Sequence, residues 1–278
     1  MILQATEPSR IPMSDGEIAL TVLSVLTLLV AWIAWQYQTN AVGVRGMPTE
    51  GRRLLRIVPV VCLVLLWWVL RNLASYDVRE DARYLFMYTV FGLAWVGIAV
   101  PFSAFAGVSM RDDVLERRNG AAAIVIAGAM LGLTLAFAGG NIGDGPGWWV
   151  VLFSALLSTL GLFLAWLLLD AFGHVSDSLT IDRDRASAVR LAGFLVAMAI
   201  ILGRAVAGDW ESVGATLRDF FVYAAPGALL LVIAIAVERA LRPTAAHVTR
   251  AVPSHGAAPA AVYVLLALAW LTQVGFGN

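Results

Sequence analysis

The chain contains eight long apolar stretches, and these limit its fold more than any other feature of the sequence. Each is close to the roughly 20 residues that a helix needs to cross a bilayer. Of the 278 residues, 60% are hydrophobic and only 14% are charged, whereas soluble domains are about a quarter charged. The sequence therefore predicts an all-α integral membrane protein. The expected spans are 18–37, 57–74, 84–107, 119–139, 148–170, 187–207, 220–238 and 259–276.

Arginine is distributed unequally between the two sets of connections. All nineteen basic residues are Arg. Thirteen lie in or beside the connections after the first, third, fifth and seventh spans, and six lie on the opposite side. Because cytoplasmic loops retain positive charge, the Arg-rich side is expected to face the cytoplasm. Both termini are then expected on the non-cytoplasmic side.

One segment of the chain recurs 65 positions later. Residues 118–128 are followed by a similar run at 183–193, and each run lies where a charged loop enters an apolar helix. The first copy contributes Arg118, Ala121, Ala123, Ala127 and Gly128, which match Arg183, Ala186, Ala188, Ala192 and Gly193. A repeat of this length indicates a fold made by copying one helical hairpin. An even number of spans in each copy makes the copies parallel.

The spans and the repeat together divide the chain into hairpin units. The last hairpin is a possible degenerate third copy, because Gly256-Ala257-Ala258 is similar to Gly120-Ala121-Ala122. The expected units are a non-cytoplasmic tail at 1–16, an N-terminal hairpin at 17–83, repeat unit one at 84–140, repeat unit two at 148–209 and a C-terminal hairpin at 218–278.

The repeated motif resembles that of a known family. Its residues here are Asn119, Ala121, Ala122, Gly128 and Gly132. The pattern is similar to the twice-repeated motif of the bacterial inner-membrane family called domain of unknown function 350, over roughly residues 84–207. The resemblance implies a multi-pass protein of the bacterial inner (plasma) membrane and implies no activity. The second copy departs from the motif, since Asp184 stands where Asn is expected.

Arg190 is the most unusual charged residue in the expected spans. Only thirteen residues separate it from Arg204, so the pair spans about 21 Å of a roughly 30 Å hydrocarbon core. Either both guanidinium groups extend to the membrane surfaces, or one lies inside the bundle beside a carboxylate. Asp170 and Glu238 end the fifth and seventh spans at a similar depth. Arg190, Asp170 and Glu238 therefore form a candidate intramembrane polar cluster.

Asp170 and His174 are four residues apart. They would share one helix face if the fifth helix continued past residue 170. That spacing suits a proton relay, which makes His174 a possible relay residue. The alternative is a solvated helix end, which Gly173 favours.

Small residues recur at four-residue spacing in the fourth and sixth spans. The positions are Gly128 and Gly132 in one span and Gly193 and Ala197 in the other. Such faces let helix backbones approach closely, and lipid provides no hydrophobic drive that would otherwise bring helices together. We interpret all four as helix-packing residues. Separately, Pro101 and Pro226 are each expected to kink a span.

Common catalytic and metal-binding motifs are missing from the sequence. It contains no Gly-x-Ser-x-Gly elbow, no His-Glu-x-x-His and no phosphate-binding loop with Lys. Its three His residues lack close metal-ligand spacing, and its net charge of zero does not suit nucleic-acid binding. We therefore expect no catalytic residues, no metal, no cofactor and no nucleic-acid partner. Membrane lipid and a cytoplasmic protein are the expected partners; the oligomeric state is open.

Three functions are compatible with these features. The favoured one is a channel- or transporter-like protein for a small solute or ion, with the candidate polar cluster along its path. The alternative is a non-catalytic membrane scaffold or subunit that presents Arg-rich loops to a protein or to anionic lipid. A membrane enzyme is the third, without a catalytic constellation to support it. A continuous polar cavity at Arg190 would favour permeation, and a dry interior packed with Ala and Gly would favour the scaffold.

Overall fold

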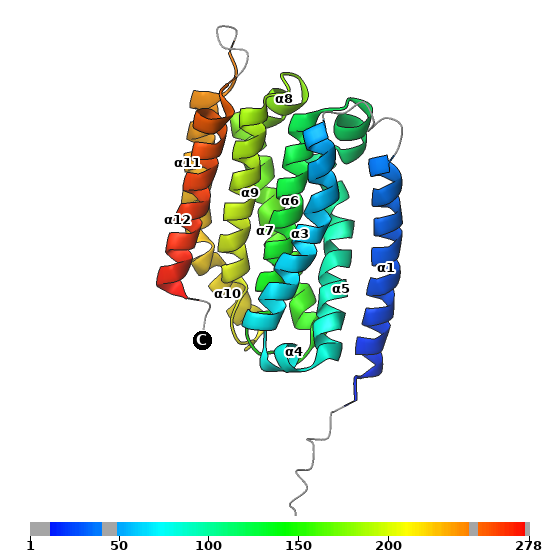
Figure 1. Ribbon diagram of the computed structural model, residues 1–278. Coiled ribbons are helices and arrows are strands. Elements are labelled where there is room, and N and C mark those ends of the chain that lie inside the picture. Colours follow the sequence, from blue (N-terminus) through cyan, green and yellow to red (C-terminus); the bar gives the residue numbers. More distant parts are fainter. Residues whose placement is uncertain (1–11, 41–48, 245–249, 276–278) are drawn as a thin grey trace, which may run out of the picture.

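The computed structural model contains eight helical spans, as the sequence predicts (Figure 1). It describes residues 12–40, 49–244 and 250–275. The described chain is an all-helical membrane protein without strands, and all eight expected spans are confirmed. The spans are Asp15–Asn40, Gly51–Leu73, Ala82–Ala106, Gly120–Gly139, Trp148–Gly173, Arg185–Ala205, Val213–Leu241 and Val252–Val274.

In the described residues, nine longer helices and two short helical segments make up these spans, and shorter helices connect them. The long helices are α1 (Asp15–Asn40), α3 (Thr49–Leu73), α5 (Ala82–Ala99), α6 (Gly120–Gly139), α7 (Trp148–Gly173), α9 (Arg185–Ala205), α10 (Val213–Tyr223), α11 (Ala225–Leu241) and α12 (Ala258–Val274). The segments η1 (Val100–Ala106) and η3 (Val252–Ala257) belong to the third and eighth spans. The connecting helices are α4 (Tyr76–Glu80), η2 (Met110–Glu116) and α8 (Val175–Thr180).

The second helices of the four hairpins lie side by side in one row. In the order α3, α6, α9 and α12, each contacts the next. The first helices pack beside this row, with α1 against α5 and α7 against α11. Burial follows the arrangement: 83% of the apolar stretch of α6 and 72% of that of α9 are buried, compared with 6% for α1. The core therefore lies along α6 and α9.

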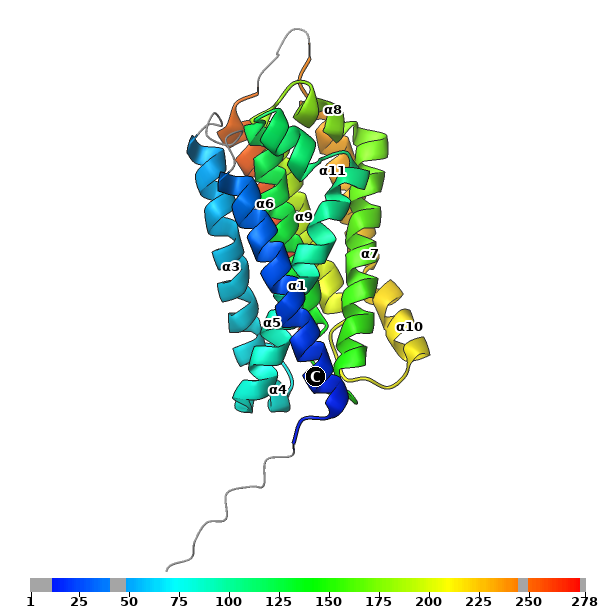
Figure 2. The ribbon, with the colours of Figure 1, turned by 90° about the vertical axis from the view of Figure 1, so that its right-hand side faces the viewer.

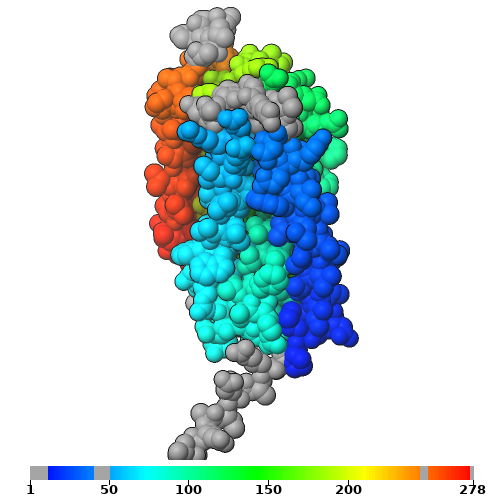
Figure 3. All heavy atoms as spheres, turned by 45° about the vertical axis from the view of Figure 1, so that its right-hand side comes forward, coloured from blue at the N-terminus to red at the C-terminus, as the bar shows by residue number. Residues whose placement is uncertain are grey.

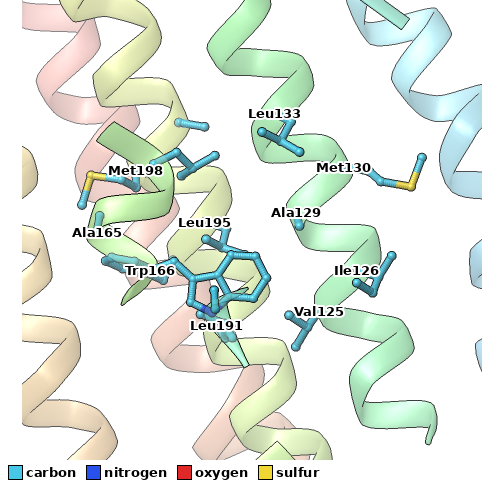
Figure 4. Packing of buried hydrophobic residues seen from close by; sticks show 14 of the residues in the cluster. Val125, Ile126, Ala129, Met130, Leu133, Ala165, Trp166, Leu191, Leu195 and Met198 are labelled. Atoms are coloured by element: carbon cyan, nitrogen blue, oxygen red, sulfur yellow. The ribbon is translucent and has the colours of Figure 1, made fainter. Parts of the chain in front are cut away.

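Apolar side chains from three helices fill this core (Figure 4). Val125 and Leu133 come from α6, Leu191 and Leu195 from α9, and Trp166 from α7. Trp166 is 2% exposed, which places a large ring inside a bundle whose other residues are mostly small or aliphatic. Close packing of this kind stabilises helix association in lipid through van der Waals contact.

The two aligned segments share an unusual backbone geometry. Arg118 and Arg183 both have φ of 54°, in the left-handed region that non-glycine residues seldom adopt. Each precedes the residue that caps a helix: Asn119 accepts from the Ala121 N–H at 2.9 Å, and Asp184 accepts from the Ser187 N–H at 2.8 Å. Asp184 thus performs the capping role of the expected Asn, because both side chains offer an oxygen acceptor. The duplication itself stays a prediction, as do the unit boundaries.

Both expected kinks are instead interruptions of a helix. α5 ends at Ala99, and the 3₁₀ segment η1, with Pro101 near its start, completes the third span. α10 ends at Tyr223, and α11 begins at Ala225 with Pro226 in its first turn. Figure 2 shows α10 projecting from the side of the bundle. Proline fits the first turn of a helix, where its missing N–H has no helical acceptor, so each proline begins a new element.

Two loops at the end of the bundle opposite α8 pair with each other. The Gly208 N–H donates to the Ile142 carbonyl and the Trp210 N–H to the Asp144 carbonyl, both at 2.8 Å. The Asp144 N–H in turn donates to the Asp209 carboxylate at 2.8 Å. These bonds join the loop after α6 to the loop after α9 outside the span ends.

Candidate functional site

Arg190 and Glu238 form a buried, bidentate ion pair. The Arg190 Nε lies 2.7 Å from Glu238 Oε1, and its Nη2 lies 2.7 Å from Oε2. The guanidinium is 0% exposed and the carboxylate side chain 2%. Two parallel charge-assisted bonds are the strongest arrangement that these groups can make. The pair joins α9 to α11 across the bundle.

Two more of the five N–H donors of the guanidinium are also occupied. Its Nη2 donates to the Ser187 hydroxyl at 2.9 Å, and its Nη1 donates to the His255 carbonyl. The Ser187 hydroxyl donates to Asp184 at 2.8 Å. Asp184, Ser187, Arg190, Glu238 and the His255 carbonyl therefore make one network, which we call the α9 polar network.

Local helix geometry explains how α9 supplies three members of this network. Asp184 is the N-cap of α9. Ser187 and Arg190 follow at intervals of three residues, which places them on neighbouring turns of one face. The acidic cap also lies at the positive end of the helix dipole, where a carboxylate is favourable. The π-helix η3 brings the His255 carbonyl to the same place, so the network ties α9 to the last hairpin.

The surroundings of the pair are apolar and closely packed. Tyr263 of α12 is 1% exposed and lies edge-on to Phe194 of α9, with ring centroids 6.4 Å apart. The Tyr263 hydroxyl has no hydrogen-bond partner within the described chain. Five of the cavities in the described chain are lined by residues other than Arg190 and Glu238. The arrangement is suited to holding helices together, because both charges are paired and enclosed.

Asp170 belongs to a different contact, so the structure brings together only two of the three predicted cluster residues. Its carboxylate accepts from the Ser176 N–H at 2.7 Å and from the Ser176 hydroxyl at 3.0 Å. It thus holds the start of α8 against the end of α7. We had expected Asp170 to pair with Arg190 because both lie at a similar depth in the membrane. The chain instead turns sharply after α7, and Ser176 provides a nearer donor for the Asp170 carboxylate.

His174 does not share a continuous helix face with Asp170. α7 ends at Gly173, and His174 is exposed with φ of 54°. Only its backbone N–H contacts Asp170, by donating to the Asp170 carbonyl at 2.7 Å. The geometry is that of a solvated helix end, the alternative that Gly173 favours.

Arg204 is buried as well, so the alternative in which both guanidinium groups extend to the membrane surfaces is wrong. Arg204 is 5% exposed, and its guanidinium lies 4.4 Å from the centre of the Tyr223 ring. Its Nε donates to the Gly275 carbonyl, just after α12. Sequence reasoning missed Tyr223 and Gly275 as partners, because both lie in elements whose contact with α9 has no sequence signal. The two buried Arg residues of α9 thus both bind the last hairpin.

The four small residues lie at helix contacts. A Cβ atom added at Gly128 would lie 2.5 Å from the Ala192 Cβ, and one added at Gly193 would lie 2.4 Å from the Ala260 Cβ. A Cβ at Gly132 would lie 3.0 Å from the Leu195 carbonyl oxygen. Ala197 is 0% exposed. The closest helix approaches in the row therefore occur where α6 meets α9 and where α9 meets α12.

No group of three or more His, Cys, Asp and Glu side chains gathers as a metal site in residues 12–40, 49–244 and 250–275. The single cysteine, Cys62, is buried as a free thiol in α3.

Eight apolar helical spans with charges paired in the interior define a multi-pass helical membrane protein. Residues 146–273 match the family model of Domain of Unknown Function (DUF350). The prediction of this family is confirmed over these residues, which are 128 of the 278 in the chain. Neither the search of curated proteins nor that of solved structures found a match.

The matched residues differ from the expected range of 84–207. They include the second motif copy and the last two spans, but not Asn119, Ala121 and Ala122, on which the resemblance was based. The match begins just before α7 and ends within α12. It therefore contains the whole α9 polar network and both hairpins that the network joins.

Proposed function

We propose that the chain is a non-catalytic membrane scaffold that presents its Arg-rich end to an acidic protein surface or to anionic lipid. The supporting observation is the enclosed Arg190–Glu238 pair, whose charges are already neutralised by each other. Intramembrane charge usually marks a pathway. A charge at 0% exposure with all three of its nitrogens bonded is instead suited to fixing helices in place.

The tightly packed interior supports the same proposal. α6 and α9 approach at glycine and alanine positions too closely to admit another methyl group. Such contact favours a rigid bundle over one that opens around a solute. The favoured sequence hypothesis, permeation along Arg190, Asp170 and Glu238, loses support because Asp170 lies in another contact.

The Arg-rich end supplies the proposed binding surface. Arg53 and Arg56 are exposed near the start of α3, at the end of the bundle that also carries α8. Arg45, in the same connection, lies outside the described residues. An Arg near an anionic surface contributes about 1 kcal/mol.

Removing two of these charges should weaken binding of an anionic surface. In nanodiscs of phosphatidylcholine, Arg53→Gln/Arg56→Gln should bind phosphatidylglycerol vesicles roughly 30-fold more weakly, from about 2 kcal/mol in total. The matched control is Arg71→Gln/Arg218→Gln, which removes two exposed Arg from the opposite side. Vesicle binding is measured by surface plasmon resonance at fixed salt. Equal losses in both variants would exclude a dedicated Arg-rich surface.

The proposal places the Arg-rich end in the cytoplasm and both termini outside it. Pro146→Cys, in the loop after α6, should react with a membrane-impermeant maleimide in intact cells. Glu116→Cys, in η2 at the Arg-rich end, should react only after the cells are permeabilised. Native Cys62 is 1% exposed and contributes little background. The reverse labelling pattern would place the Arg-rich loops outside and overturn the orientation.

Permeation remains a second candidate because of the interrupted seventh span. α10 and α11 meet at Ala224, next to Pro226 and to Tyr223, whose ring contacts Arg204. Broken spans expose backbone groups to ions in transporters. The scaffold proposal expects proteoliposomes to conduct protons and monovalent ions no faster than protein-free liposomes. Flux above that level, abolished by Pro226→Ala, would favour permeation instead.

A further inference from the structure

An apolar cavity lies between α1 and the rest of the bundle. It has a volume of about 330 Å³. α1 contributes Leu28, Leu29 and Trp32, and α3 contributes Pro59 and Leu63. Figure 3 shows α1 as an outer column beside α3 and α5. A cavity so placed opens toward the lipid that surrounds the bundle.

A second cavity, of about 300 Å³, continues the first toward the Arg-rich end. The two share Ala31, Trp35, Val96, Gly97 and Met130, so they form one space, which we call the α1 groove. Beyond the shared residues, the second cavity is lined by the polar side chains of Gln38, Ser109 and Arg111 and by apolar residues of η1 and its neighbours. The α1 groove is thus apolar at one end and has three polar side chains at the other, which we call its polar end.

Two contacts hold α1 at a fixed place and leave the groove between them. A Cβ added at Gly97 of α5 would lie 2.8 Å from the Ala31 Cβ, so α1 approaches α5 closely at that point. The Trp35 Nε1–H donates to the Leu55 carbonyl of α3 at 3.1 Å. Because these contacts fix the helix on two sides, the space between them is a defined cavity. Its two parts each reach the lower end of the size range of ligand sites.

Positive charge lies at the polar end of the α1 groove. The Arg111 Nε contacts Glu116 at 3.4 Å, and this exposed contact leaves both Nη groups without a partner in the described chain. A second guanidinium, that of Arg56, donates to the Asn40 side chain at 2.9 Å. Asn40 is the last residue of α1, so Arg56 adds a positive charge at the same end of this helix as the polar end of the groove. Guanidinium groups bind phosphate oxygens well.

We propose that the α1 groove binds an anionic phospholipid, with one acyl chain in the apolar part and the phosphate at Arg111. The apolar part of the groove suits an acyl chain, and Arg111 at the polar end suits a phosphate group. Basic pockets between helices near the membrane surface bind anionic head groups in this way. Moving an acyl chain from bulk lipid into the groove changes its free energy little. The head group therefore provides most of the preference for an anionic lipid. This site rests on the proposed function, because it gives the anionic-lipid partner of the Arg-rich end a defined pocket, and it depends on Arg111 and not on Arg53.

The test compares head groups on matched acyl chains. The full chain in detergent is titrated with phosphatidylglycerol or phosphatidylcholine, and the retained lipids are counted by native mass spectrometry. We expect tighter binding of phosphatidylglycerol. Arg111→Gln should weaken it about fivefold, the loss expected for one Arg at an anionic surface, without changing phosphatidylcholine binding. The control is Arg239→Gln, an exposed Arg on α11 that contacts the Phe172 carbonyl.

A second variant tests whether the groove itself holds the lipid. Ala34 is exposed and lines the polar cavity, so Ala34→Trp should fill the groove without entering the core. It should reduce binding of both lipids, whereas Ala236→Trp, at an exposed position of α11, should not. An unchanged head-group preference in Arg111→Gln, or equal lipid binding by the two Trp variants, would overturn the proposal. Displacement of the lipid by soluble glycerol phosphate would overturn it too, because the acyl chain would then contribute nothing.

Discussion

Replacing Glu238 alone with Leu should destabilise the folded protein by about 3–5 kcal/mol, the usual cost of leaving a buried charge without its partner. Arg190 would keep its bonds to Ser187 and to the His255 carbonyl but lose both bonds to a carboxylate. The change is measured by SDS titration of the purified protein in mixed micelles, followed by tryptophan fluorescence. Glu80→Leu, at an exposed position near the end of α4, is the control.

The double variant Arg190→Leu/Glu238→Leu separates a structural pair from a functional one. Apolar replacement of both members of a buried pair is often neutral or stabilising. The double variant should therefore recover most of the stability that Glu238→Leu loses. A stable single variant would show that Arg190 finds water or another anion, and the interior would then be wetter than the packing indicates. If the variants are stable but alter ion flux, the Arg190–Glu238 pair would support the permeation hypothesis.

Gly128→Leu should destabilise the bundle by about 3 kcal/mol, at the upper end of the usual cost of overpacking. The first added carbon alone would lie 2.5 Å from the Ala192 Cβ and 2.6 Å from its Cα. Since the Cα belongs to the backbone, the clash is relieved only if α6 and α9 move apart. The same SDS titration measures the loss.

A matched substitution at an open glycine provides the control. A Cβ at Gly214 of α10 would meet nothing within 4 Å. Gly214→Leu should therefore leave stability unchanged or raise it by up to about 1 kcal/mol, because Leu has the higher helix propensity. If the two variants lost equal stability, the contact between α6 and α9 would not be the rigid seam that its geometry indicates.

The spans were predictable because lipid imposes one rule on every segment that crosses it. A spanning helix must make all its backbone hydrogen bonds within itself and must expose apolar side chains to the lipid. Both requirements can be recognised from a short stretch of sequence. The interrupted third and seventh spans were visible only as Pro101 and Pro226. A proline marks where a helix is disturbed, but the surrounding packing decides whether the result is a kink or a break.

The candidate site was predictable in part. Arg190 was visible because charge is rare in an apolar run, and Glu238 because it ends a span at a similar depth. Depth along the membrane does not determine which helix faces which, so Asp170 was an equal candidate. Ser187 and the His255 carbonyl carried no signal, since a serine and a backbone carbonyl are common everywhere. Pairing between helices depends on rotation about each axis, and the sequence specifies this only weakly.

The α9 polar network also constrains how the chain is synthesised. Arg190 and Glu238 are 48 residues apart, so at about 5–20 residues per second the ribosome makes the acid roughly 2–10 s after the base. During that interval α9 carries a guanidinium without its counter-ion, which disfavours its release into bulk lipid. α9 should therefore wait at the insertion machinery or against α6 until α11 arrives, and the final two hairpins enter the bilayer as one cooperative step.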